Sequence, residues 1–197
     1  MAAQQIARNV LDRLAAPRPT RTRSSLLFDE SFTGPLDPEH WSLRTITEGA
    51  TAFDAAVSVV SSGGRLMITP RANVCGVHHG GAATARTFAM TCGAAEVELV
   101  QATSALSLAA TTFAVVADAG RYYRMTVEGS VLLFESTDSG STNIPFDAVQ
   151  HRRLRIRHDC VDNLLLFETS ADGVTWSVRR SVSATVSMSA AYVELEA

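Results

Sequence analysis

Short segments in which apolar and polar side chains alternate, separated by turn residues, constrain this chain more than any other feature of its sequence. In the segment Tyr122–Val127 every second side chain suits a protein core, and in Arg153–Arg157 arginine alternates with Leu154 and Ile156. A period of two places successive side chains on opposite faces of a β-strand. Many such segments, with no helical period between them, predict antiparallel strands instead of an α/β protein.

Turn residues lie between these segments at the spacing of β-hairpins. Gly63-Gly64, Glu128-Gly129-Ser130 and Asp172-Gly173 each supply glycine where a tight turn needs it. Together the strands and turns predict an all-β protein in which two antiparallel sheets pack face to face as a sandwich. The other expected strands are Arg65–Thr69, Ala95–Val100, Thr111–Ala117, Val131–Glu135, Leu164–Thr169 and Tyr192–Leu195.

The N-terminal segment follows a different period. From Ala2 to Ala16 the apolar residues recur at helical spacing, which predicts a short amphipathic helix that ends at Pro17 and Pro19. A helix of this length is only marginally stable alone, so its apolar side needs a partner: the sandwich, a second copy or another protein. That side consists of Ile6, Val10, Leu11 and Leu14.

The change of period divides the chain into two parts. Residues 1–25 are expected to form a helical arm and linker, and residues 26–197 a single sandwich domain. Because the arm presents an apolar side, it is expected to mediate oligomerisation or docking to an assembly.

Composition and charge narrow the classes of partner. Hydrophobic residues make up 46% of the chain, which is enough for a sizeable core and argues against global disorder. The net charge of -3 provides no basic field for nucleic acid or an anionic membrane. No run approaches the roughly 20 apolar residues of a membrane span, and no secretory signal is recognised. A soluble, cytoplasmic protein is therefore expected, with neither nucleic acid nor membrane as a partner.

The three cysteines are Cys75, Cys92 and Cys160. Their number is odd and their spacings match no zinc or redox motif. Free buried thiols, typical of a reducing compartment, are the first expectation. A disulfide between Cys75 and Cys92 is the alternative.

Several motifs, taken in order, resemble the concanavalin A-like lectin/glucanase superfamily, whose jelly-roll members include laminin-G-like domains. The most specific is Ser170-Ala171-Asp172-Gly173-Val174-Thr175-Trp176, in which a tight hairpin turn precedes a large aromatic side chain that anchors it to a sheet. The remaining motifs are Leu27–Phe32, Leu36–Trp41, Gly64–Ile68, Tyr122–Met125 and Arg153–Ile156.

The resemblance covers the chain from about Leu26 to Ala197 and implies a jelly roll of two curved antiparallel sheets. It does not assign a function, because the superfamily includes lectins, carbohydrate-binding modules, glycosidases and adhesion or structural domains.

Glycoside hydrolysis requires two carboxyl groups at a short, defined separation. Glu96 and Glu98 lie two residues apart on an expected strand, so their side chains share a face and are the catalytic candidates. The resemblance implies a Glu-x-Asp-x-x-Glu strand in laminarinase-type enzymes. This strand has Glu98 in place of the central Asp and Gln101 in place of the last Glu. The alternative is that alternation alone places both glutamates on a solvated face.

Sugar binding is the second candidate function. Lectin-like sites combine aromatic rings with side chains that hydrogen-bond to hydroxyl groups. If the strands that carry the candidate residues are neighbours, these residues are expected to form one ligand-binding face. The alternative is an ordinary charged face that discourages the edge strands from pairing with other chains. The candidate ligand-binding residues are Tyr122, Arg124, His151, Arg153, Arg155 and Arg157.

Metal binding is the third candidate. Cys75, His78 and His79 lie close together in a Gly-rich stretch, and thiolate and imidazole both suit zinc. Their spacing completes no four-ligand motif, so a flexible loop is the alternative. By resemblance to related jelly rolls, Asp29 and Glu30 with a C-terminal glutamate are candidates for a structural calcium ion. No other cofactor is expected.

The sequence therefore favours a non-catalytic binding or interaction module, for a glycan or for a protein. A glycosidase-like hydrolase and a structural subunit of a larger assembly are the alternatives.

Overall fold

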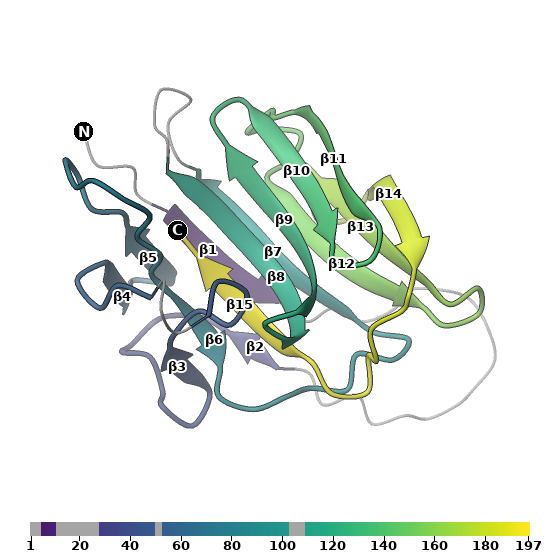
Figure 1. Cartoon of the computed structure of the whole chain (residues 1–197), viewed down its shortest axis with the longest axis horizontal. Helices are drawn as coiled ribbons and strands as arrows, with labels where there is room; N and C mark the ends of the chain where they lie inside the picture. The colour runs from purple at the N-terminus through teal and green to yellow at the C-terminus, as the bar shows by residue number, and fades with distance from the viewer. Residues whose placement is uncertain (1–4, 11–27, 50–52, 103–108) are drawn as a thin grey trace.

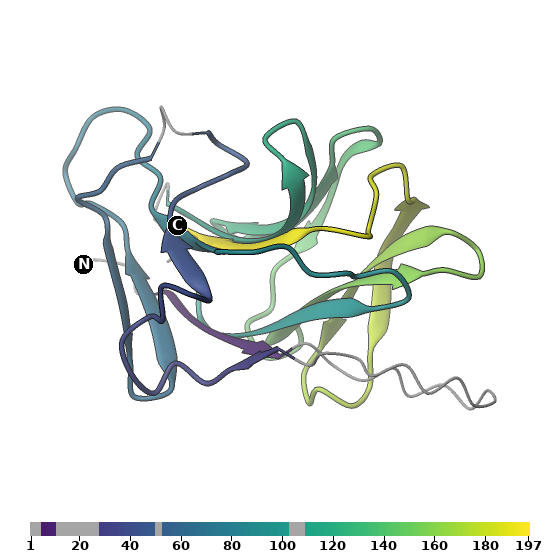
Figure 2. The same cartoon turned by 90° about the horizontal axis from the view of Figure 1, so that it is seen from below.

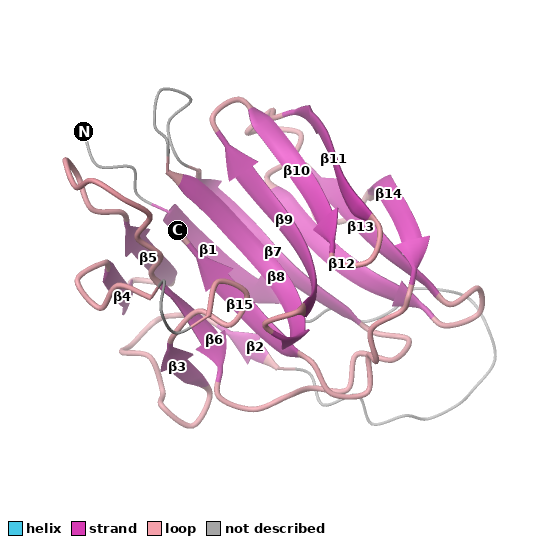
Figure 3. Ribbon diagram, in the orientation of Figure 1, coloured by secondary structure: helices cyan, strands magenta, loops and turns pink. Residues whose placement is uncertain are grey.

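The computed structural model describes residues 5–10, 28–49, 53–102 and 109–197, the first of these ranges by its backbone alone. All regular structure in these ranges is β-strand, and every pair of named strands is antiparallel (Figure 3). The all-β expectation is confirmed. The strands are β1 (Gln5–Val10), β2 (Asp29–Glu30), β3 (Trp41–Leu43), β4 (Ser58–Ser62), β5 (Arg65–Thr69), β6 (Gly81–Thr84), β7 (Ala94–Gln101), β8 (Ala110–Asp118), β9 (Arg121–Glu128), β10 (Val131–Ser136), β11 (Gly140–Pro145), β12 (Arg153–Asp159), β13 (Leu164–Ser170), β14 (Ser177–Ser183) and β15 (Tyr192–Glu196).

The strands form two sheets that pack as a sandwich (Figures 1 and 2). The eight-stranded sheet has the order β14-β13-β12-β7-β1-β5-β4, with β2 paired to β1. The seven-stranded sheet has the order β11-β10-β9-β8-β15-β6-β3. Figure 2 shows the two layers, with β15 in yellow in one and β1 in purple in the other. Because the described residues contain no helix, none of them forms a helical membrane span.

Alternation decides which side chains enter the core between the sheets. On β9, Tyr123 and Met125 are buried in the core cluster, and on β12 so are Leu154 and Ile156. They face Phe167 and other apolar side chains from both sheets. Burying an aliphatic or aromatic side chain of this size stabilises the fold by about 1.5–3 kcal/mol. The intervening residues therefore point outward, as the period-two pattern predicts.

The turn after β13 has the structure that its sequence predicts. The side chain of Asp172 accepts hydrogen bonds from the backbone N–H groups of Val174 and Thr175, both at 2.8 Å, and these bonds lower the pKa of Asp172 to about 2. Gly173 has a φ of +77°, which is costly for any residue with a Cβ. The indole Nε1 of Trp176 donates to the Gly173 carbonyl at 3.2 Å, so the aromatic side chain anchors the turn.

The N-terminal helix is not supported. Gln5–Val10 runs as β1 and pairs with β5 on one side and β7 on the other, so it is part of the sandwich and not of a separate arm. The rest of the expected helix, and the linker that follows it, lies outside the described residues. Pairing with two strands supplies far more hydrogen bonds than an isolated short helix, so tertiary context overrides the local helical pattern. The docking role expected for this segment stays a prediction, because Leu11 and Leu14 lie outside the described residues.

Both expectations for the cysteines are wrong. Cys92 and Cys160 form a disulfide, and Cys75 is the free, exposed cysteine. Cys92 precedes β7 and Cys160 follows β12, and these strands are neighbours whose register pairs Ala94 with Arg157. The pairing brings together two residues that are 68 apart in sequence, which local spacing could not reveal.

Two strands lie outside those that the sequence predicts. The Gly-rich stretch from Cys75 ends in β6, which begins at Gly81, and β11 begins at Gly140. Both strands are short and poor in large apolar residues, so they carry little of the alternation that marks the others.

Candidate functional site

The outer face of the seven-stranded sheet carries a cluster of charged side chains. The register places Glu194 of β15 beside Ala114 of β8, Ala114 beside Arg124 of β9, and Arg124 beside Glu135 of β10. Opposite residues of antiparallel strands share a face, so one row across four strands holds two carboxylates and an arginine. We name the whole group the carboxylate cluster; it consists of Glu48, His79, Tyr122, Arg124, Glu135, Glu194 and Glu196.

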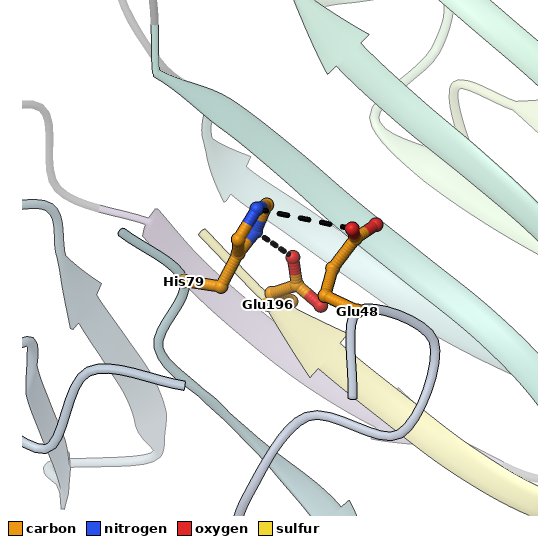
Figure 4. Close-up of side chains that lie close together, drawn as sticks. All are labelled: Glu48, His79 and Glu196. Atoms are coloured by element: carbon orange, nitrogen blue, oxygen red, sulfur yellow. Dashed lines mark hydrogen bonds and ion pairs between the residues drawn. The ribbon is translucent and has the colours of Figure 1, made fainter. Parts of the chain in front are cut away.

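Close backbone contact places His79 in this cluster. Gly80 and Ala197 exchange backbone hydrogen bonds at 3.0 and 2.9 Å, which holds the chain before β6 against the end of β15. A Cβ on Gly81 would lie 2.3 Å from the Leu195 carbonyl oxygen, so only glycine fits there. The imidazole Nδ1 of His79 consequently lies 2.5 Å from Oε1 of Glu196 (Figure 4).

Residues 44–49, which follow β3, cover part of the cluster. The backbone N–H of Ile46 and the hydroxyl of Thr47 donate to Glu194, the latter at 2.5 Å. The Thr47 hydroxyl also lies 3.4 Å from Oε2 of Glu196. Glu48 reaches outward from the same segment, and its Oε2 lies 3.9 Å from Nε2 of His79. In Figure 4, Glu196 rises from β15 between His79 and Glu48.

Arg124 links the two sides of the cluster. One guanidinium nitrogen lies 2.5 Å from Oε1 of Glu48, and Nε donates to Oε2 of Glu135 at 2.9 Å. The hydroxyl of Tyr122 donates to the other oxygen of Glu135 at 2.8 Å, and the guanidinium lies 4.9 Å from the centre of the Tyr122 ring. Burial opposes the charge of Arg124, but its hydrogen bonds to Glu135 and Glu48 raise its pKa above the ordinary value.

The cluster holds more negative than positive charge. Four carboxyl groups face one arginine and one histidine. Burial, together with the charge of Glu196, raises the pKa of Glu194 to about 7 against the hydrogen bonds from Thr47 and Ile46. The hydrogen bond to Glu196 raises the pKa of His79, although burial acts in the opposite direction. An imidazolium–carboxylate pair between His79 and Glu196 therefore compensates part of the negative charge.

A shallow hollow of about 390 Å³ adjoins the cluster at the β8–β9 turn. Arg44 lies at its side, with its guanidinium 4.9 Å from the centre of the Tyr192 ring and one nitrogen donating to the Thr84 carbonyl at 3.1 Å. The volume is within the range of small-molecule sites. The hollow is lined by Arg44, Thr45, Ile46, Gly49, Phe53 and Ala119.

The expected catalytic pair lies elsewhere. Glu96 and Glu98 point outward from β7 on the eight-stranded sheet, and both are buried beneath arginine side chains. Arg153 lies 3.2 Å from Glu96 and 2.6 Å from Glu98, and Arg152 lies 2.6 Å from Glu98. The two carboxyl groups are thus part of an ion-pair network and not of an open cleft. This arrangement does not fit the acid and base of a glycosidase.

The expected ligand-binding residues do not share one face. Tyr122 and Arg124 belong to the carboxylate cluster, whereas Arg153, Arg155 and Arg157 point outward from the opposite sheet. Arg155 donates to Glu168 at 2.6 Å and lies 3.8 Å from the centre of the Trp176 ring, and Arg157 lies 3.0 Å from the same glutamate. We name this network the arginine ladder; it consists of Glu96, Glu98, Arg152, Arg153, Arg155, Arg157 and Glu168.

His151 belongs to neither group. It is buried ahead of β12, and its Nδ1 accepts a hydrogen bond from the backbone N–H of Asp147 at 3.0 Å. Burial, and then the charge of Arg179, lower the pKa of His151. A neutral imidazole that orders a turn is the role that these contacts indicate.

The structure does not bring the three expected metal ligands together at one site. His79 lies in the carboxylate cluster, but His78 pairs with Asp54 at 2.8 Å, and Cys75 is exposed. Within the part of the chain that the structure describes, the group suited to a metal ion is Glu48, His79 and Glu196, whose ligand atoms lie within 4.8 Å of one another.

The candidate calcium ligands are also apart. Glu30 accepts hydrogen bonds from the Phe32 N–H at 2.9 Å and from the Trp41 indole at 3.2 Å. Asp29 and Glu30 belong to β2 of the eight-stranded sheet, whereas the C-terminal glutamates belong to β15 of the other sheet.

No protein-family model, curated protein or solved structure matches the chain. The geometry of the described residues therefore carries the functional argument.

Sequence reasoning missed most of the carboxylate cluster. The alternation of Glu194 and Glu196 with Val193 and Leu195 is as regular as that of Glu96 and Glu98 and could have identified the pair. Glu48 lies outside any strand, so no periodicity marks it.

Proposed function

We propose that this protein is a non-catalytic binding module that holds a glycan on the outer face of its seven-stranded sheet. The observation that carries the proposal is the mainly apolar hollow beside the carboxylate cluster, where Arg44 is held by the Thr84 carbonyl and the same segment continues to Glu48 of the cluster. Sites of this kind combine apolar contact with a few oriented polar groups.

The polar groups are held in place before a ligand arrives. Arg124 is oriented by Glu48 and Glu135, and Tyr122 by Glu135, while Arg124 and Glu135 each keep 21% of their side-chain surface exposed. Carboxylate, guanidinium and phenol groups together accept and donate hydrogen bonds, as sugar hydroxyls require. Preorganised groups lose little conformational entropy on binding.

The charge of the face favours a neutral glycan over an acidic one. Four carboxyl groups lie in the cluster, opposed by Arg124 and His79. A ligand carrying its own carboxylate or sulfate would meet like charge, which costs affinity.

We further propose that the sandwich is of the concanavalin A-like jelly-roll type. Its support is the antiparallel pairing in both sheets, the insertion of the C-terminal strand β15 between β8 and β6, and the alternation of successive strands between sheets from β6 to β8. The resemblance of the turn motif that ends at Trp176 is consistent with this type.

A glycosidase-like activity is the second candidate, on different residues from those first expected. Glu194 and Glu196 hydrogen-bond to the same Thr47 hydroxyl, and the pKa of Glu194 is raised to about 7, as in a general acid. Both carboxyl groups are buried, so hydrolysis would require residues 44–49 to move. Release of reducing ends from a bound oligosaccharide, abolished by Glu194→Gln, is the test that separates this candidate from simple binding.

A glycan array followed by calorimetric titration tests the binding proposal. The wild type should bind neutral oligosaccharides, and Arg124→Ala should weaken binding by about tenfold or more, because a charged hydrogen-bonding group is lost. Arg152→Ala, on the opposite sheet and with 54% of its side chain exposed, is the matched control and should bind as the wild type does. An array on which the folded wild type binds no neutral glycan overturns the proposal.

A further inference from the structure

We infer that Glu48, His79 and Glu196 form a binding site for a divalent transition-metal ion of the zinc or manganese class. The ion lies between Nε2 of His79 and Oε2 of Glu48, with Glu196 holding the imidazole from the other side. This inference does not depend on glycan binding.

The distances suit one shared ion. Nε2 of His79 and Oε2 of Glu48 are 3.9 Å apart, and the nearest ligand atoms of all three residues fall within 4.8 Å. Two ligand atoms that each lie about 2.1 Å from a tetrahedral metal ion are about 3.4 Å apart, so the two atoms need to approach by about 0.5 Å. An ion therefore fits between these two side chains with little movement, and water completes its coordination.

The three side chains are also oriented for such a role. Oε1 of Glu48 is held by Arg124, which leaves Oε2 toward the imidazole. Nδ1 of His79 bonds to Glu196 at 2.5 Å, which sets the ring plane and directs Nε2 toward Glu48. A carboxylate behind a ligating histidine is the usual arrangement at metal sites, because it fixes the ring and increases its basicity.

Charge supplies an independent argument. Glu194 and Glu135 add two further carboxyl groups beside the site, while Arg124 is the cluster's permanent cation. A bound divalent cation would offset this excess, and the half-buried position of His79 and Glu48 would reduce screening by solvent. One imidazole with carboxylates favours zinc or manganese over calcium, which prefers oxygen ligands alone.

Isothermal titration of the chelator-treated protein with Zn²⁺ and with Mn²⁺, and with Ca²⁺ for comparison, tests the site. The wild type should bind one equivalent of Zn²⁺ or Mn²⁺, and His79→Ala and Glu48→Gln should each weaken binding at least tenfold. His78→Ala is the matched control, because His78 is the neighbouring residue but pairs with Asp54 outside the site; it should bind as the wild type does.

Three outcomes would overturn the inference. The first is no binding of either ion by the folded wild type. The second is loss of binding in His78→Ala or Cys75→Ser with retention in His79→Ala, which would move the site to the Gly-rich loop. The third is Ca²⁺ binding as tight as Mn²⁺ binding and unchanged in His79→Ala, which would show a site of oxygen ligands without the imidazole. Circular dichroism of each variant verifies that the sandwich is intact, so that a lost site is not mistaken for a lost fold.

Discussion

The same sequence pattern, two glutamates separated by one residue, has different surroundings on the two outer faces of the sandwich. Each has a strand on which two glutamates lie two residues apart: Glu96 and Glu98 on β7, Glu194 and Glu196 on β15. In the arginine ladder three carboxylates meet four guanidinium groups. In the carboxylate cluster four carboxyl groups meet one guanidinium and one imidazole.

The strand register explains the difference. Neighbouring β12 places Arg155 opposite Glu96 and Arg153 opposite Glu98, so each carboxylate receives a cross-strand cation. On the other sheet, β15 lies between β8 and β6, which place Ala114 and Ala83 opposite Glu194. With small residues on both sides, the counter-charges come from loops and from one strand further away. Each carboxylate of the ladder therefore has a guanidinium partner, whereas the cluster holds more carboxyl groups than cations.

The largest expected effect comes from the disulfide beside the ladder. Cys92–Cys160 closes a span of 68 residues and joins the ends of β7 and β12. The Cys92→Ser, Cys160→Ser double variant should lose about 4 kcal/mol of unfolding free energy, because its unfolded chain is less restricted. Chemical denaturation measures the loss; Cys75→Ser is the control and should leave stability unchanged.

The second-largest expected effect comes from the arginine ladder. Arg153→Met removes the guanidinium that touches both Glu96 and Glu98 and keeps the apolar stem of the side chain. Two buried carboxylates lose a partner, so the unfolding free energy should fall by about 3 kcal/mol. Urea denaturation measures it, and a fall no larger than that of the more exposed Arg152→Met would contradict the buried network.

Stability should depend on pH through Glu194 of the carboxylate cluster. The pKa of Glu194 is about 7 in the folded protein against an ordinary 4.5, so its proton is bound more tightly when the protein is folded. The stabilisation is complete below pH 4.5 and is lost as the pH rises through about 7. Between pH 5 and pH 8 the loss due to Glu194 should be roughly 2–3 kcal/mol in the presence of a chelator.

The variant Glu194→Gln tests whether Glu194 is the source of this pH dependence. The variant cannot ionise at this position, so the slope of stability between pH 5 and pH 8 should fall by the contribution of Glu194. The remaining slope should come from His79, whose pKa is raised, and from His151, whose pKa is lowered. Glu98→Gln, in the ladder, should keep the slope while lowering stability at both pH values, because it loses contacts to Arg152 and Arg153. Equal slopes in the wild type and Glu194→Gln would argue against a raised pKa.

The smallest effect concerns the edge of the cluster. Tyr122→Phe removes one hydrogen bond to Glu135 and leaves the ring beneath Arg124. The expected loss of stability is about 1 kcal/mol. Glycan affinity should fall several-fold, because one oriented hydroxyl of the binding face is lost. Thermal unfolding and titration with the best array ligand measure the two effects separately.

The N-terminal segment shows where local patterns mislead. Its apolar residues recur at helical spacing, but a gap between β5 and β7 offers backbone partners along both edges of Gln5–Val10. Local spacing contains no information about that gap. The same reasoning applies to Cys92 and Cys160, which are brought together by the pairing of β7 with β12.

The sequence by itself determined the strand class and, in strands with regular alternation, the direction of the side chains, because a period of two distinguishes core-facing from outward-facing residues without knowledge of the partner strand. It therefore placed Arg124, Arg155 and Glu98 correctly on the outside. Only the tertiary structure decided which outward residues meet, because strand order depends on pairing between distant segments. That order separated Arg124 from Arg155 and brought Glu48, His79 and Glu196 together.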